Sequence, residues 1–283
     1  MAVFTNFATL SYNGGSTVSN TVTGEILQTL ALTKTPLVGE YVAADVVTYV
    51  ITLNNTGTTP FTGLTLTDDL GGYALGDSTV YPLAYRDGSI GYFLNGVLQA
   101  TPTVTAGPPL VISGINVPAG GNAVLVYQAT TTAFAPLGAN DTITNTVTAT
   151  GGGLTAPLTD SATITTADTS DLSITKSVSP AVVMENGQLT YTFLIENRGN
   201  APAVATDAVV LTDTFDPILS DITVTLNGAT LIPGTDYTYN TATGLFETSP
   251  GVITVPAATF TQNPDGTFTV IPGSVTVTVT GTV

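Results

Sequence analysis

The feature that most limits the fold of this chain is a two-residue alternation of β-branched and other apolar residues in short runs. The runs VVTYVITL (46–53), NTVTAT (145–150) and SVTVTVTGTV (274–283) show it most clearly. A period of two places alternate side chains on opposite faces of a strand, and Thr, Val and Ile are typical of strands. Segments rich in Gly and Pro, such as 105–110 and 118–122, interrupt the runs as turns would. The sequence therefore predicts an all-β protein.

The composition excludes several classes of function. The 283 residues include four Lys and Arg, 20 Asp and Glu, and no His or Cys. Without His or Cys, a Ser-His-Asp triad, a thiol nucleophile or a zinc finger is impossible. An acidic chain with so few basic residues cannot neutralise phosphates, so nucleic acid is not an expected partner. No apolar run reaches the roughly 18 residues of a membrane span. We expect neither an enzyme nor a bound cofactor.

An internal repeat divides the chain into two copies of one domain. Residues 30–70 match residues 172–215. The match aligns four pairs of residues: Lys34 with Lys176, Tyr49 with Tyr191, Asn55 with Asn197, and Asp68 with Asp213. We therefore expect two tandem immunoglobulin-like β-sandwiches, at residues 26–168 and 169–283, after an N-terminal segment of residues 1–25.

The second copy lacks the last hairpin of the first. The first copy continues through 140–168, two strands around a Gly-rich turn, and the N-terminal residues 5–26 resemble that hairpin. A sandwich without its final strands exposes unpaired backbone groups, and an isolated hairpin is marginally stable in water. We predict that residues 1–25 complete the second domain of another molecule by strand addition, which makes a head-to-tail homopolymer. The alternative is that residues 1–25 fold back onto their own chain.

Strand parity places two of the four basic residues on inward faces. Lys34 continues the apolar face of Leu30 and Leu32, and Lys176 lies on the face that begins at Leu172. A buried ammonium without a partner is costly and tends to lose its proton. Each lysine is therefore expected to have an inward partner.

The partners suggest covalent chemistry. Asp68 and Asp213 each lie on an inward face, and the first copy adds an inward Asn145. Such a set predicts a Lys-Asn isopeptide bond, in which a neutral amine attacks the amide carbon, a carboxylic acid shuttles protons and ammonia leaves. An apolar setting favours the neutral amine and the neutral acid, and close positioning supplies the effective molarity. We predict this bond for Lys34, Asp68 and Asn145; the alternative is a buried Lys-Asp ion pair with an Asn hydrogen bond.

The second copy has no such asparagine, so the N-terminal segment must supply one. Asn6 aligns with Asn145, and we predict a bond between Asn6 of one subunit and Lys176 of the next, with Asp213 as the acid. Asn20, whose counterpart in the first copy is Ala162, is the rival acceptor. The donor residues expected to pack inside the second domain are Phe4, Ala8, Leu10, Tyr12, Val18 and Val22.

These motifs resemble known families. A first-strand Lys, a Thr-Asp near the middle and a late-strand Asn resemble the isopeptide-forming domains of Gram-positive pilins. The wider pattern TK…Y-x-I/F…N-x-G…TD…N-x-V, over roughly residues 26–283, resembles the bacterial surface-repeat family called "domain of unknown function 11". The start MA-x-F-TN-x-ATLSYNGG resembles self-assembling fibre proteins of spore-forming Firmicutes. The resemblance implies an extracellular structure on a bacterial cell or spore, although the N-terminus lacks the features of a secretory signal.

The expected function is therefore that of a structural subunit of an extracellular filament, such as a pilus or spore appendage. The alternative is a two-domain adhesin or a surface module that binds calcium or carbohydrate. Asp168 and Asp171 are weak calcium candidates, because carboxylates ligate calcium but their spacing matches no known loop.

Overall fold

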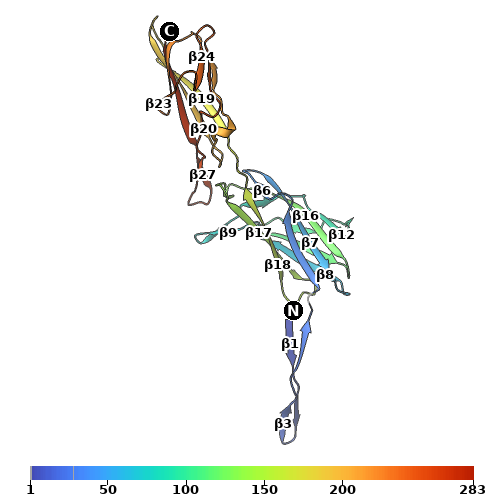
Figure 1. The fold of residues 1–283 in the computed structure, drawn as a ribbon. Coiled ribbons are helices and arrows are strands. Elements are labelled where there is room, and N and C mark those ends of the chain that lie inside the picture. The colour runs from blue at the N-terminus through green and yellow to red at the C-terminus, as the bar shows by residue number, and fades with distance from the viewer. Residues whose placement is uncertain (1, 28) are drawn as a thin grey trace. The chain divides into compact units, whose positions relative to one another are not determined.

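The computed structural model describes residues 2–27 and 29–283, and strands with their connections make up almost all of it (Figure 1). The all-β prediction is confirmed. Within the described ranges the one helical element is a short 3-10 turn, Ala205–Asp207. Contacts between Cα atoms divide the chain into two compact units. Unit 1 comprises Met1–Ala135 and Thr142–Thr165, and unit 2 comprises Pro136–Asp141 and Thr166–Val283.

Unit 1 contains two six-stranded antiparallel sheets. The first sheet has the strands β13 (Val97–Leu98), β12 (Gly91–Leu94), β16 (Asn122–Thr131), β7 (Val46–Asn55) and β5 (Leu30–Pro36), with β11 (Leu83–Tyr85) also on β16. The second sheet has the order β14 (Thr103–Thr105), β15 (Leu110–Val117), β8 (Phe61–Asp68), β17 (Thr142–Gly151), β18 (Leu158–Thr166) and β6 (Glu40–Tyr41). A small hairpin joins β9 (Tyr73–Leu75) to β10 (Ser78–Val80).

The core of unit 1 follows from the alternation in the sequence. Every second residue of β7 and β16 is buried, so one face of each strand belongs to the core. Tyr49 of β7 lies opposite Tyr127 of β16, and both side chains are fully buried. The rings stack with centroids 5.6 Å apart. This tyrosine pair lies next to the inward lysine described below.

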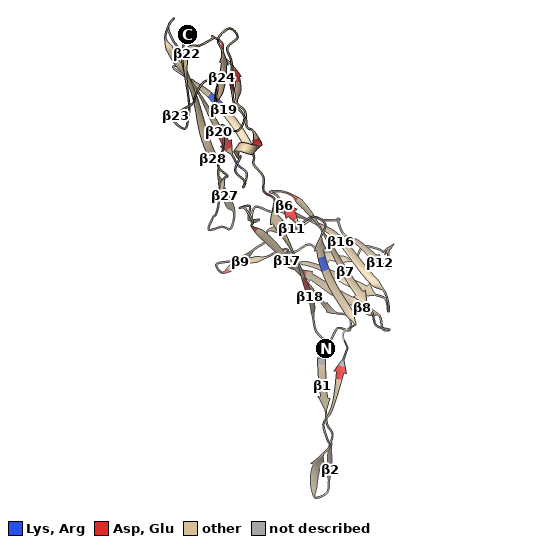
Figure 2. Ribbon diagram, viewed as in Figure 1, with Lys and Arg blue, Asp and Glu red and all other residues tan. Residues whose placement is uncertain are grey.

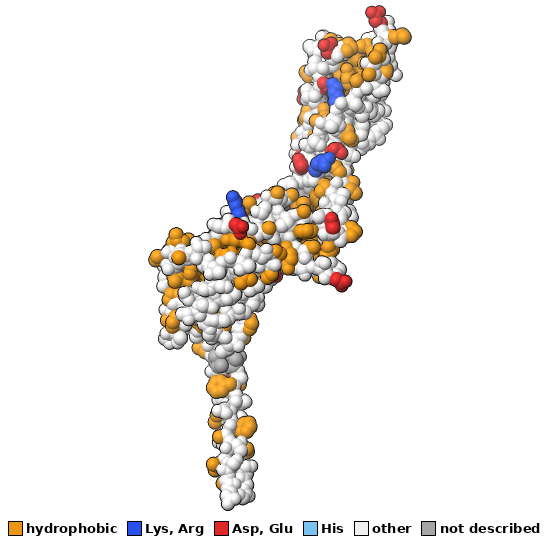
Figure 3. All heavy atoms as spheres, turned by 180° about the vertical axis from the view of Figure 1, so that it is seen from behind, with side chains coloured by type: hydrophobic (Ala, Val, Ile, Leu, Met, Phe, Trp, Pro, Cys, Tyr) orange, Lys and Arg blue, Asp and Glu red, His pale blue; other side chains and the backbone are white. Residues whose placement is uncertain are grey.

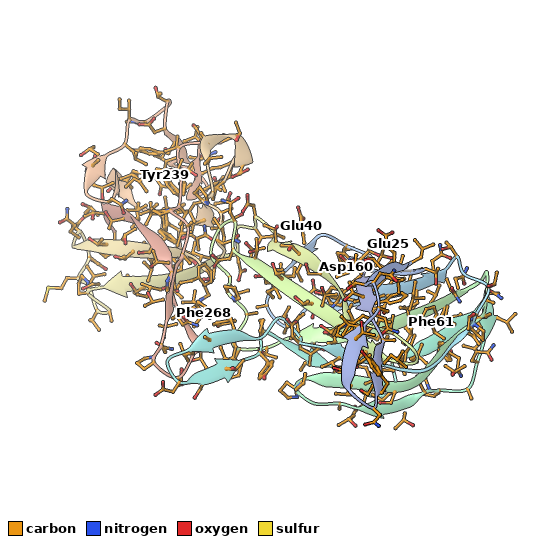
Figure 4. The ribbon with its side chains drawn as sticks, turned by 90° about the horizontal axis from the view of Figure 1, so that it is seen from below. Glu25, Glu40, Phe61, Asp160, Tyr239 and Phe268 are labelled. Carbon is orange, nitrogen blue, oxygen red and sulfur yellow. The ribbon has the colours of Figure 1, made fainter. Side chains whose placement is uncertain are left out.

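The hairpin β17–β18 completes the second sheet of unit 1. β17 pairs with β8 along one edge, where Val147 lies opposite Asp68. Along its other edge β17 pairs with β18, where Asn145 lies opposite Ala162. β18 in turn pairs with β6. Figure 4 labels one residue of each strand, Asp160 of β18 and Glu40 of β6. Without this hairpin, β8 would be an edge strand and β6 would have no partner in this sheet.

Unit 2 has one five-stranded sheet and smaller ones. The large sheet has the order β19 (Leu172–Ser179), β20 (Gln188–Asn197), β28 (Gly273–Thr282), β22 (Ser220–Leu226) and β23 (Ala229–Thr230). The smaller ones contain β21 (Thr212–Thr214), β25 (Leu245–Thr248) and β24 (Tyr237–Asn240), and β26 (Thr259–Gln262) with β27 (Phe268–Ile271). Its core includes Phe193, Phe215 and Phe246.

The two units differ where the repeat predicts a missing hairpin. β21 of unit 2 carries Asp213, the counterpart of Asp68 on β8. Whereas β8 pairs with β15 and β17, β21 pairs with β25 alone among the described strands. No strand of unit 2 stands where β17 and β18 stand in unit 1.

The N-terminal residues form a ladder that pairs only with itself in the described part of the chain. β1 (Ala2–Asn6) pairs with β4 (Val22–Ile26), and β2 (Thr9–Tyr12) pairs with β3 (Gly15–Val18). Contacts group this hairpin with unit 1, whereas the sequence predicts a separate segment.

Candidate functional site

The inward face of β5 carries Lys34, and its ammonium is completely buried. The side chain is 0% exposed, and Nζ lies 2.7 Å from Oδ2 of Asp68 at the end of β8. The second oxygen of Asp68 accepts a hydrogen bond from the amide of Leu70 at 3.1 Å. The Lys34 ammonium also lies 4.9 Å from the ring centroid of Tyr49. The buried lysine thus has an acidic partner, as its inward position required. Figure 2, with Lys and Arg in blue, shows how few other basic residues the chain has.

A buried tyrosine connects this pair to the predicted asparagine. The hydroxyl of Tyr127 donates to Oδ2 of Asp68 at 2.5 Å, and Nδ2 of Asn145 donates to that hydroxyl at 3.1 Å. Oδ1 of Asn145 is buried and has no hydrogen-bond partner. The structure therefore brings Lys34, Asp68 and Asn145 into one network through a residue that the sequence analysis missed. Tyr127 could have been found by parity, because it alternates with the buried Leu125 and Ala129.

Burial sets the ionisation of this network. Desolvation lowers the pKa of Lys34 from its ordinary 10.5, and the charge of Asp68 opposes that shift. Desolvation also raises the pKa of Tyr127 well above its usual value, so the phenol keeps its proton. A buried Lys with a lowered pKa gives up its proton more readily to a neighbouring carboxylate. The site can thus provide a neutral amine, a proton carrier and an amide within the buried core of unit 1.

The corresponding lysine of unit 2 is open to solvent. Lys176 of β19 makes an ion pair with Asp213, but its side chain is 40% exposed. Its ammonium lies 4.4 Å from the ring centroid of Tyr191 and 5.4 Å from that of Phe215. The Lys-Asp pair is therefore present in both units, and only unit 1 also contributes an asparagine.

The face of β19 around Lys176 is uncovered as well. Leu172 is 39% exposed, whereas its counterpart Leu30 on β5 is 2% exposed. Ile174 and Val178, which share this face, are also exposed. In unit 1 the hairpin β17–β18 lies by the equivalent strand, where the carboxylate of Asp160 accepts a hydrogen bond from the amide of Lys34 at 2.6 Å. The exposed face of β19 is the face that such a hairpin would cover.

A further exposed segment lies in unit 2 where β6 lies in unit 1. Counting from the paired lysines, Val182 and Val183 correspond to Glu40 and Tyr41 of β6. β6 is held by β18, but Val182 and the nearby Met184 are both more than four-fifths exposed. The uncovered part of unit 2 thus includes the place where the last strand of a hairpin would pair.

The N-terminal hairpin carries apolar side chains that are not buried. Phe4, Leu10, Tyr12, Val18 and Val22 are all more than half exposed. Figure 3 shows these hydrophobic groups in orange along the hairpin. An exposed row of large apolar side chains is a typical mark of an interaction surface.

The predicted donor residues do not all share one face of this hairpin. Val18 lies opposite Thr9, whereas Leu10 lies opposite Thr17. In this hairpin Val18 therefore points to the side away from Leu10, and the packing of both inside a second domain stays a prediction. The reason is a one-residue shift of register between the two ladders, because Asn6 lies opposite Val22 but Thr9 lies opposite Val18.

The structure also corrects the alignment of Asn20. Asn6 lies opposite Val22 just as Asn145 lies opposite Ala162, so Val22 is the counterpart of Ala162. Asn20 lies two residues earlier, outside the strands. Ala8, the counterpart of Val147, is hydrogen-bonded to Ser19, as Val147 lies opposite Asp160, so Ser19 and Asn20 together stand at the position of Asp160. The rival role of Asn20 as the acceptor stays a prediction. The pairing of Asn6 with Lys176 across subunits stays a prediction.

The calcium candidates form no recognisable metal site. In the described ranges no group of three or more Asp, Glu, His or Cys residues could hold a metal ion. Asp168 and Asp171 are both exposed, and the Asp171 amide donates to Oδ1 of Asn197 at 2.9 Å. In the same ranges no helix is long and apolar enough to cross a membrane.

Comparison with known proteins yields similar structures only. No family model matches the chain, so the resemblance to "domain of unknown function 11" is not confirmed, and no curated protein matches either. A variant of BcpA, the major pilin subunit of Bacillus cereus, is 11% identical with a TM-score of 0.40, over 94% of this chain and 73% of that one. The RrgB pilus backbone of Streptococcus pneumoniae is 12% identical with a TM-score of 0.36, over 86% and 55%. A collagen-binding domain of a Staphylococcus aureus adhesin is 11% identical with a TM-score of 0.31, over 50% and 99%. At this level the similarity concerns the fold alone.

Proposed function

We propose that the chain is the structural subunit of an extracellular bacterial filament, in which the N-terminal hairpin of one subunit completes unit 2 of the next. One observation carries the proposal. The closing hairpin that covers Lys34 in unit 1 has no counterpart in unit 2, while a matching hairpin with exposed apolar side chains lies at the N-terminus. Strand addition typically buries surfaces of both kinds, the uncovered strands of unit 2 and the exposed apolar side chains of the hairpin.

Unit 1 provides the register for the docked state. Asn6 corresponds to Asn145, so Ala8 corresponds to Val147, which lies opposite Asp68. In the junction Ala8 then lies opposite Asp213, and Leu10 lies opposite Leu211, the counterpart of Leu66. The first donor strand thus forms an antiparallel ladder on the free edge of β21.

The second donor strand, β4, also has an expected pairing partner in unit 2. In unit 1 β18 pairs with β6, so β4 is expected to pair with the exposed segment at Val182 and Val183. Ser19 and Asn20 share the position of Asp160, and of the two Asn20 is expected to accept a hydrogen bond from the amide of Lys176, as Asp160 does from Lys34. This assigns Asn20 to positioning the junction, and Asn6 remains the acceptor for the cross-link.

The energetic terms favour docking of a hairpin that is already formed. Each large apolar side chain that becomes buried contributes roughly 1.5–3 kcal/mol. Ordering a free strand costs about 1–2 kcal/mol per residue, but pairing within β1–β4 and β2–β3 meets part of that cost before docking. Because the contact joins two different surfaces, it repeats from subunit to subunit and does not close into a two-fold dimer.

Docking would also complete the second chemical site. It covers the exposed ammonium of Lys176 and places the Asn6 amide where Asn145 stands in unit 1. The amine of Lys176 then attacks Cγ of Asn6, ammonia leaves, and Asp213 carries the protons. The covalent link would make each junction resistant to denaturants.

Deletion of residues 2–25 tests the strand insertion. We expect soluble monomers by sedimentation and no filaments by negative-stain microscopy, while the full chain forms filaments. A synthetic peptide of residues 1–27 should bind the truncated chain and block assembly of the full chain. Filaments that persist after the deletion would contradict the proposal, and so would a full-length chain that remains monomeric, as the fold-back arrangement predicts.

Boiling in SDS tests the covalent link. Multimers of the full chain should survive, and each link should remove the mass of one ammonia. Asn6→Ala should abolish the resistant multimers while filaments still form. Asn20→Ala is the matched control, and it should keep them. Loss of the ladder in Asn20→Ala alone would reverse the assignment of the two asparagines.

A further inference from the structure

The hydroxyl of Tyr127 lies between the acid and the amide of the unit 1 site. It donates to Oδ2 of Asp68 at 2.5 Å and accepts from Nδ2 of Asn145 at 3.1 Å. The ammonium of Lys34 lies 2.7 Å from the same carboxylate oxygen. A single hydrogen-bonded chain therefore runs from the amine, through the carboxylate and the phenol, to the amide nitrogen that must leave.

The departure of that nitrogen is the difficult step of an amide exchange. The anion NH₂⁻ is too basic to leave, so the nitrogen must first gain a proton and leave as ammonia. Lys34 first transfers a proton to Asp68, and its neutral amine then attacks Cγ of Asn145. The new C–N bond forms as the carbonyl π bond opens, and the amide nitrogen regains its lone pair. One proton must reach this nitrogen before the old C–N bond breaks and releases ammonia. The attacking nitrogen gives up a proton to the carboxylate, which restores the balance.

We propose that Tyr127 is a catalytic residue of this reaction, a relay that passes the proton of Asp68 to the leaving nitrogen of Asn145. The proposal rests on the isopeptide bond proposed for unit 1. Once Asp68 holds a proton and Nδ2 has regained its lone pair, the two hydrogen bonds reverse. The carboxylic acid then donates to the phenol oxygen, and the phenol delivers its own proton to Nδ2. Tyr127 ends the reaction unchanged, and ammonia carries the transferred proton away.

The surroundings suit this role. Tyr127 is fully buried, so water does not compete as a proton carrier. The partner ring in the stack, Tyr49, is equally buried and its hydroxyl interacts with the Asn145 side chain, but it makes no hydrogen bond to Asp68. Only Tyr127 therefore connects the carboxylate to the amide.

Unit 2 lacks this residue. Tyr127 lies opposite Tyr49, and the counterpart of Tyr49, Tyr191, lies opposite Val279. Val279 is fully buried and cannot carry a proton. The site in unit 1 therefore has a relay built into its core, and the site at the junction has none. We expect the bond in unit 1 to form much faster than the bond between subunits.

The test is the rate of ammonia loss from the full chain. The chain is made by cell-free synthesis, quenched in denaturant at timed intervals and digested, and the peptide that joins Lys34 to Asn145 is quantified by mass spectrometry. Tyr127→Phe should slow its formation by roughly 10²-fold or more, the usual contribution of a positioned acid-base group. Tyr49→Phe is the matched control, since it removes from the same stack a phenol oxygen that contacts Asn145 but not Asp68, and it should slow the reaction far less than Tyr127→Phe does.

Each outcome separates the relay from the bond itself. If the wild type never forms the joined peptide, the isopeptide proposal for unit 1 fails, and the relay fails with it. If the wild type forms it and Tyr127→Phe does so equally fast, or if both Phe variants slow equally, the relay alone is overturned. Should Tyr127→Phe fail to fold, 3-fluorotyrosine at position 127 keeps the shape and changes the acidity of the phenol. The rate should then change by more than about twofold, with a smaller change for 3-fluorotyrosine at position 49.

Discussion

The side chain of Leu10 offers the sharpest test of the junction. Leu10 is 65% exposed on the hairpin, and the register of unit 1 places it against Leu211, which lies in the core of unit 2. Complete burial of a leucine contributes roughly 1.5–3 kcal/mol, so burial of the exposed two-thirds contributes about 1–2 kcal/mol. Leu10→Ala removes most of this contribution from every junction.

The assay must report a reversible equilibrium, so it uses chains that cannot cross-link. Lys176→Met removes the nucleophile for any acceptor while the apolar stem is kept. In chains with Lys176→Met, each subunit that joins a filament forms one junction. The free energy of one junction therefore determines the critical concentration for assembly. A loss of 1–2 kcal/mol should raise the critical concentration roughly 5- to 30-fold, measured by sedimentation of filaments.

Thr9→Ala is the matched control for Leu10→Ala. Thr9 lies next to Leu10 on β2, but its side chain points to the opposite face of the strand. In the docked register it corresponds to Thr148, whose side chain points away from the core. Its replacement should change the critical concentration by less than about twofold. Equal effects of the two substitutions would refute the assigned face, and no effect of either would refute the insertion itself.

Three other predictions concern the donor face and the buried lysine. Val22→Ala should raise the critical concentration more than Val18→Ala, because the shifted register turns Val18 away from Leu10; the reverse order would show that docking removes the shift. Chains with Asn145→Ala cannot form the bond in unit 1. In these chains Lys34→Met should lower the free energy of unfolding by roughly 3–5 kcal/mol, because Asp68 remains buried without its cation. A decrease of less than about 1 kcal/mol in urea titration would contradict this prediction. In the same Asn145→Ala chains the free energy of unfolding should rise with pH between the lowered pKa of folded Lys34 and the ordinary lysine pKa of 10.5, because in that pH range the unfolded chain binds more protons than the folded one. If the rise persists after Lys34→Met is added, another group causes it.

The sequence was sufficient to predict the inward lysines and their acids. A strand repeats every two residues, so Leu30 and Leu32 determine the face of Lys34, and Leu64 and Leu66 determine that of Asp68. The structure finds both side chains on those faces in one buried pair. Such predictions succeed because parity is a property of a single strand and needs no knowledge of its neighbours.

Features that depend on pairing between strands were harder to predict. The counterpart of Ala162 is Val22 and not Asn20, because Asn6 lies opposite Val22 as Asn145 lies opposite Ala162. Parity places Tyr127 inward, but its hydrogen bonds to Asp68 and Asn145 depend on how β16 lies against β8 and β17. In both cases the information lies in the register between strands, which alternation within one strand does not determine.

The difference between the two lysine sites follows from how each hairpin reaches its position. In unit 1 the covering hairpin β17–β18 belongs to the same chain, so covering Lys34 is intramolecular and does not depend on concentration. At a junction the hairpin comes from another molecule, and the full cost of association is paid at every subunit. A filament built this way is weakest at its junctions, and the chain has no Cys for a disulfide there. A covalent Lys176–Asn6 link therefore has more mechanical value than the bond in unit 1. The slower formation that we expect for this link without a phenol relay would also be useful, because a misplaced hairpin could dissociate before it is fixed.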